Sequence, residues 1–123
     1  MFFEIRKIAI TAIIGLIHLS SHADLIGVNN ANNPLSSKRI DELKYLVKQD
    51  CGSCHGMLFK GGLGPALLPK NLSSLTNKQV ADIILYGMPA TAMPPWQGIL
   101  SMQEAMWIAR SLKTGSLSDT NSK

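Results

Sequence analysis

Two cysteines and a histidine lie within five consecutive positions of the chain, in the stretch QDCGSCHGM. They are Cys51, Cys54 and His55, and the chain contains no further cysteine. Thiols and imidazoles bind metals, attack electrophiles and anchor cofactors, so this cluster is the strongest candidate for chemistry. The two other histidines lie in the first 23 residues, so what the cluster can hold depends on whether that segment is kept.

The first 23 residues have the three parts of a secretory signal. Arg6 and Lys7 precede the apolar run IAITAIIGLIHL, and a short polar stretch follows up to Ala23. A bilayer-spanning helix needs about 20 apolar residues, whereas this run is shorter and is interrupted by His18. We therefore expect cleavage after Ala23 and a periplasmic protein, rather than a retained membrane anchor.

Size and charge exclude several classes of protein. The chain has 123 residues, enough for one small domain, and its formal net charge of +4 is too weak and too scattered to suggest a nucleic-acid partner. A domain this small buries a limited core and often depends on a metal, a disulfide or a cofactor. The cysteine and histidine cluster is the one candidate for such a group.

The remaining sequence predicts an all-α domain. Apolar residues recur at helical spacing over residues 37–49, in a helix that leads into the cluster. Capping boxes open two further helices, TNKQ at 76–79 and SMQE at 101–104, and Gly87 and Gly115 are placed to end them. Loops rich in glycine and proline connect these helices. The predicted parts of the chain are a signal peptide at 1–23, a flexible leader at 24–36, the domain at 37–114 and a disordered tail at 115–123.

Four kinds of site compete for the cluster. Zinc needs four ligands, and the domain offers three soft ones. A thioredoxin-like redox pair belongs to a βαβ unit, and no strand pattern is present. A disulfide closing so small a ring stabilises little and leaves His55 unexplained. In C-x-x-C-H, by contrast, Cys51 and Cys54 form thioethers to a haem and His55 binds its iron, so we predict one covalently attached haem c.

A methionine is expected as the second axial ligand, because the domain has no second histidine. The candidates are Met57, Met88, Met93, Met102 and Met106. Met57 is too close to His55 in sequence, and the last two lie on a predicted helix, where methionine usually fills the core. Met93, followed by two prolines, is the preferred ligand, and Met88 is the alternative.

The loop after the cluster is expected to orient the histidine. A ligating imidazole commonly donates its other N–H to a backbone carbonyl. Gly64-Pro65 forms a rigid turn, and the carbonyl of Pro65 is the predicted acceptor. Leu67, together with Leu63 and Leu68, is expected to line the haem edge.

These motifs carry a family resemblance. A helix leading into CGSCH, then G-P-x-L, a middle helix, A-M-P and a final helix resemble a class I cytochrome c from about residue 37 to 113. The stretches QDCGSCHGM, GGLGPAL and ATAMPPW are similar, more narrowly, to NirC-type periplasmic cytochromes c of denitrifying bacteria. In that family we expect glycine where Ala90 stands and often a charged residue near Met88, which argues against Met88 as the general ligand.

The resemblance implies a one-electron carrier rather than an enzyme. Its redox partners would be cytochrome cd-type nitrite reductase or the maturation enzymes of the d-type haem. Two alternatives stay open: an assembly factor in d-type haem maturation, and a ligand-binding sensor or enzyme with a labile Met93. Ligation by both His55 and Met93 favours the carrier, because no coordination position is left for a substrate.

Overall fold

The computed structural model describes residues 34–118, and all regular structure in that range is helical. The elements in chain order are α1 Ser37–Leu46, the π-helical turn η1 Val47–Cys51, α2 Gly52–His55, the 3₁₀ turn η2 Pro69–Asn71, α3 Asn77–Tyr86 and α4 Met102–Thr114. The predicted all-α class is confirmed. The predicted signal peptide lies outside the described residues, and none of the described helices is long and apolar enough to cross a membrane.

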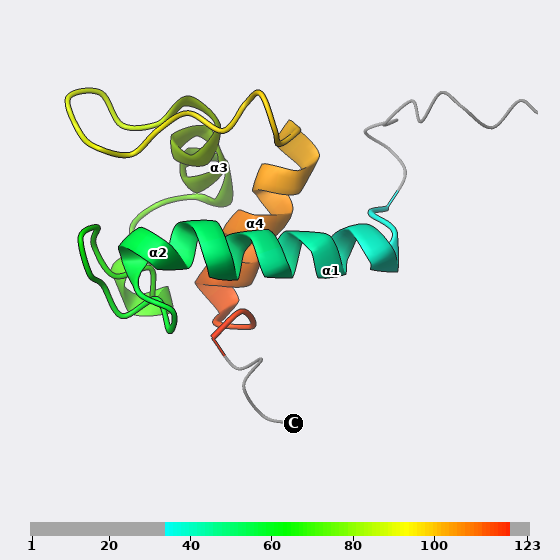
Figure 1. Cartoon of the computed structure of the whole chain (residues 1–123), viewed down its shortest axis with the longest axis horizontal. Helices are drawn as coiled ribbons and strands as arrows, with labels where there is room; N and C mark the ends of the chain where they lie inside the picture. Colours follow the sequence, from blue (N-terminus) through cyan, green and yellow to red (C-terminus); the bar gives the residue numbers. More distant parts are fainter. Residues whose placement is uncertain (1–33, 119–123) are drawn as a thin grey trace, which may run out of the picture.

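The first helical segment is longer than the sequence predicted. Ser36 caps it by accepting a hydrogen bond from the backbone N–H of Arg39. The helix predicted to end at Gln49 continues through η1 and α2. Figure 1 shows α1 and α2 as one nearly straight rod. Gly56, with a φ of 83°, follows His55 and ends the rod. The cysteine and histidine cluster therefore lies on its last turns.

Both predicted capping boxes are present. The side chains of Thr76 and Gln79 at the start of α3, and of Ser101 and Glu104 at the start of α4, each accept a hydrogen bond from the other residue's backbone N–H. Glycines end both helices, as predicted, with φ of 73° after α3 and 78° after α4. Local side-chain chemistry therefore sets where α3 and α4 begin and end.

The core is formed by α3 packed against α4 together with Leu43 and Val47 of the rod, which α4 crosses in Figure 1. The apolar residues of α4 that recur at helical spacing are all buried, namely Ala105, Ile108, Ala109 and Leu112. An ion pair between Arg39 and the largely buried Glu104 also joins α1 to α4. This packing fixes the rod, and with it the cluster, relative to the loop that follows α3.

Both predicted domain boundaries need correction. Leu35, assigned to the flexible leader, packs against the core. Leu117, assigned to the disordered tail, is only 7% exposed in a turn that follows α4. Each is an apolar residue within a polar stretch, and burying its side chain stabilises a few residues beyond the helix end. Residues 119–123 of the predicted tail lie outside the described range.

Candidate haem-binding site

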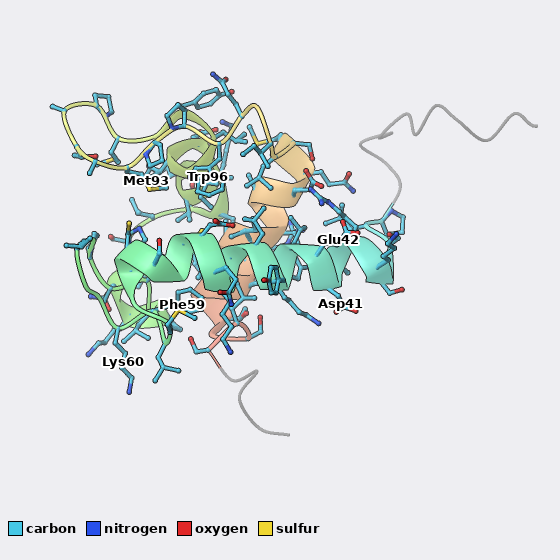
Figure 2. All side chains as sticks on the ribbon, viewed as in Figure 1. Asp41, Glu42, Phe59, Lys60, Met93 and Trp96 are labelled. Carbon is cyan, nitrogen blue, oxygen red and sulfur yellow. The ribbon has the colours of Figure 1, made fainter. Side chains whose placement is uncertain are left out.

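A cavity of about 790 Å³ is lined by the cysteine and histidine cluster on one side and by the loop after α3 on the other. Its volume lies within the range of about 300–1,000 Å³ that is typical of cofactor pockets. Among the described residues that line it, Asp50 is the only carboxylate, and most of the others are apolar. Figure 2 shows Met93 between the yellow loop and the green helical rod. The tertiary structure thus brings the two predicted ligands to one cavity.

The imidazole of His55 is held in one tautomer. Its Nδ1 lies 2.7 Å from the carbonyl oxygen of Pro65, and a carbonyl can only accept, so Nδ1–H is the donor. This confirms the predicted hydrogen bond and leaves the lone pair of Nε2 for a metal. His55 is 9% exposed, so few other orientations are open to its ring. The role of His55 as an iron ligand remains a prediction.

Both thiols line the same cavity and neither forms a disulfide. Cys51 is half-buried and Cys54 is exposed. Burial, and then the charge of Asp50, raise the pKa of the Cys51 thiol to about 11. A redox-active C-x-x-C pair needs a thiol pKa that is lowered. The environment of Cys51 therefore argues against a thioredoxin-like pair and suits a site of covalent attachment.

Both the preferred ligand Met93 and the alternative Met88 line the cavity, so its lining alone does not choose between them. Their exposure separates them: Met93 is half-buried, whereas Met88 is 45% exposed. The other three candidates, Met57, Met102 and Met106, do not line this cavity. The structure thus narrows the choice to Met93 and Met88, and burial favours Met93.

The three leucines of the second loop behave differently from one another. Leu67 lines the cavity as predicted. Leu63 lines it too, although 93% of its surface is exposed, whereas Leu68 does not line it, so the prediction is wrong for Leu68. Leu63 is exposed because the glycines on both sides of it lie in close contact with the cluster. A Cβ at Gly62 would lie 2.8 Å from the carbonyl oxygen of Cys54. The side chain between two such inward contacts points outward.

Trp96 is a cavity residue that the sequence analysis did not identify. It lines the cavity, and its indole Nε1 is buried without a hydrogen-bond partner among the described atoms. Its backbone N–H donates to the carbonyls of Ile84 and Leu85 at 3.1 and 3.0 Å, which ties the loop to the end of α3. The only sequence signal was its place directly after Met93-Pro94-Pro95.

These residues fit a haem c. Two thiols stand at the C-x-x-C spacing, an imidazole has its Nδ1 occupied and its Nε2 free, and a thioether lies across a largely apolar cavity. The fold and the site together define a c-type cytochrome domain.

Comparison with known proteins shows the family to which the chain belongs. Residues 38–110 match the family described as cytochrome C oxidase, cbb3-type, subunit III. A curated protein named cytochrome c55X from Paracoccus denitrificans is 47% identical over 76 residues, which span 62% of this chain and 74% of that protein. Its namesake from Pseudomonas aeruginosa is 43% identical over 81 residues, spanning 66% and 68%. The chain belongs to this cytochrome c family and, within it, to the cytochrome c55X group.

Solved structures agree with this assignment. The structure entitled c-type cytochrome NirC has a TM-score of 0.66 at 42% identity and covers 68% of this chain and 98% of its own. A second, entitled dihydro-heme d1 dehydrogenase NirN in complex with DHE, has a TM-score of 0.51 at 40% identity over 57% of this chain and 15% of its own. The cofactor of this chain is therefore a covalently attached haem c with its iron.

Proposed function

We propose that the protein is a periplasmic one-electron carrier whose haem iron is held between His55 and Met93. The observation that carries this proposal is the hydrogen bond from Nδ1 of His55 to Pro65, because it leaves Nε2 free in a cavity that Met93 also lines. Two ligands from the chain leave no coordination position for a substrate. The predicted signal at residues 1–23 supports the periplasm, where c-type haem is attached.

The bound haem supplies a one-electron couple, and the chain determines how readily that couple is reduced. The carbonyl of Pro65 keeps the imidazole in one orientation, so ligation needs no rearrangement of His55. The thioether of Met93 favours the reduced state. Apolar walls do the same, because they disfavour the additional positive charge of the oxidised state. Together these residues give a high reduction potential.

Cytochrome cd-type nitrite reductase is the proposed electron acceptor. Support comes from the resemblance of the CGSCH, GGLGPAL and ATAMPPW stretches to NirC-type cytochromes and from the similarity to the solved NirC. The test mixes the reduced holo-protein with purified oxidised nitrite reductase and follows haem c oxidation by stopped-flow absorbance. Oxidation at a rate that rises with reductase concentration is expected. No oxidation beyond that seen with a non-partner haem protein contradicts this choice of acceptor.

A role in d-type haem maturation is the second candidate. It is favoured by 47% identity over 55 residues to dihydro-heme d1 dehydrogenase of Pseudomonas aeruginosa, spanning 45% of this chain and 11% of that protein. Deleting the gene for this chain and measuring the d-type haem content of nitrite reductase separates the two roles. Loss of d-type haem supports maturation, whereas normal haem content with a slower supply of electrons supports donation.

A further inference from the structure

Thr91 connects the two loop methionines through its hydroxyl. Its Oγ1 donates to the carbonyl of Met88 at 2.8 Å and accepts from the backbone N–H of Met93 at 3.2 Å. The N–H of Thr91 donates to the same Met88 carbonyl, and the N–H of Met88 donates to the carbonyl of Met93 at 3.3 Å. Four hydrogen bonds thus close a small turn around Thr91, and the two candidate ligands lie at its ends.

The base of this turn is held independently of Thr91. A Cβ at Gly87 would lie 2.6 Å from the carbonyl oxygen of Met93, so a glycine is needed for the two ends to approach. Beyond the turn, the backbone N–H of Trp96 is bonded to carbonyls at the end of α3. The base therefore stays in place without the Thr91 hydroxyl, and the tip is the part that depends on it.

The tip also contains a strained residue. Ala90 has a φ of 60°, in the left-handed region that is unfavourable for a residue with a Cβ. Relaxation of Ala90 would turn the peptides next to it and move Met93 relative to the cavity. The two hydrogen bonds of the Thr91 hydroxyl oppose this relaxation, because they span Ala90 from Met88 to Met93.

We propose that Thr91 is the positioning residue that holds Met93 on the haem iron. The inference rests on the proposed carrier function, in which Met93 is the second axial ligand. Removing the hydroxyl leaves the N–H of Met93 without its acceptor. It also removes one of the two hydrogen bonds to the carbonyl of Met88. The loop tip then relaxes, and the sulfur of Met93 leaves the iron more readily while the rest of the domain is unchanged.

The test compares three holo-protein variants. Thr91→Val keeps the side-chain shape and removes the hydroxyl, and Thr91→Ser keeps the hydroxyl. Thr114→Val is the matched control, because the hydroxyl of Thr114 bonds the carbonyl of Ser111 at the far end of α4, outside the cavity. Imidazole is titrated into each ferric protein, and loss of the sulfur-to-iron absorption band reports displacement of the methionine.

We expect Thr91→Val to bind imidazole roughly tenfold more tightly than the wild type, the factor expected when two hydrogen bonds are lost. Thr91→Ser and Thr114→Val should stay within about twofold of the wild type, since each leaves the bonds of the Thr91 hydroxyl in place. Equal affinity in Thr91→Val and wild type overturns the proposal. So does an equal increase in Thr114→Val, because that would show a general loss of stability.

A second measurement needs no variant. The amide proton of Met93 should exchange slowly with solvent in the wild-type protein, because it is donated to the hydroxyl of Thr91 within a turn that four hydrogen bonds close. Exchange at the rate of an unprotected peptide overturns the proposal. Failure of the proposed carrier function gives a different result. In that case the wild-type ferric protein lacks the sulfur-to-iron band, or Met93→Ala retains it. Either result also contradicts the proposed role of Thr91.

Discussion

The backbone of Gly64 lies directly against the imidazole of His55. A Cβ built on Gly64 would lie 2.7 Å from Cε1 and 2.8 Å from Nδ1 of that ring. The glycine before Pro65 is therefore needed both for the turn and for the space that the ring occupies. Any side chain at this position must displace the imidazole or the loop.

We predict that Gly64→Ala pushes His55 away from the carbonyl of Pro65. Overpacking of this kind costs about 1–3 kcal/mol of folding free energy. Thermal unfolding of the holo-protein measures the loss, and its absorption spectrum reports weaker proximal ligation. Gly98→Ala is the control, since a Cβ there meets nothing within 4 Å. Equal stability of the two variants would show that the contact between Gly64 and His55 is not tight.

Replacing both thiols, in Cys51→Ala with Cys54→Ala, should abolish covalent attachment of the haem. Both line the cavity, and the described residues contain no other thiol to form a thioether. Denaturing gel electrophoresis followed by haem staining measures attachment. A stained band in the double variant would refute attachment at these cysteines. The single variants should each retain a stained band of lower intensity, because one thioether remains.

Met93→Ala and Met88→Ala test the choice of ligand against each other. If Met93 binds the iron, Met93→Ala removes the sulfur-to-iron absorption band and lowers the reduction potential, because the thioether that favours the reduced state is gone. Met88→Ala should change neither, since its side chain is 45% exposed at the cavity rim. Spectroelectrochemistry measures both quantities. Loss of the band in Met88→Ala alone would reverse the assignment.

Ala90→Gly should stabilise the protein. An alanine in the left-handed region costs about 1–2 kcal/mol, and glycine gives back about 0.4–1 kcal/mol through the greater entropy of the unfolded chain. A net gain of about 0.5–1 kcal/mol in the free energy of unfolding follows. Ala92→Gly is the matched control, because Ala92 does not have a positive φ, and it should be destabilising. Chemical denaturation measures both, and a destabilised Ala90→Gly would contradict the strain.

Glu104 should link the stability of the fold to pH. Burial of Glu104 raises its pKa, but hydrogen bonds from Arg39 and from Ser101 outweigh burial and hold the pKa below its usual value. The folded pKa lies below the unfolded value of about 4.3, so the stabilisation is present above pH of about 4.3 and is lost as pH falls through the folded pKa.

We therefore predict that Glu104→Gln lowers the free energy of unfolding by about 1–3 kcal/mol at pH 7, with a difference that shrinks below pH of about 4. Denaturant unfolding at pH 7 and below pH of about 4 measures the difference in the free energy of unfolding. Asp41→Asn, which breaks the exposed pair of Asp41 with Lys44, should change stability by less than about 1 kcal/mol. An effect of Glu104→Gln that is the same at both pH values would contradict the linkage.

The sequence by itself determined the features that depend on neighbouring residues. The C-x-x-C-H spacing, the two capping boxes and the glycines after α3 and α4 involve residues within a few positions of one another, and the structure has each of these features where the sequence predicted it. The hydrogen bond of His55 to Pro65 spans ten positions and was also predictable, because a glycine and a proline restrict the turn between them.

Only the tertiary structure decided what depends on segments that meet across the cavity. The outward side chain of Leu63 follows from the close contact of Gly62 and Gly64 with the helical rod, and the burial of Leu117 follows from the position of the core beneath it. The role of Thr91 follows from a loop conformation that contains a strained Ala90. Sequence periodicity does not report such contacts, because the packing of distant segments determines which side of a loop faces the core.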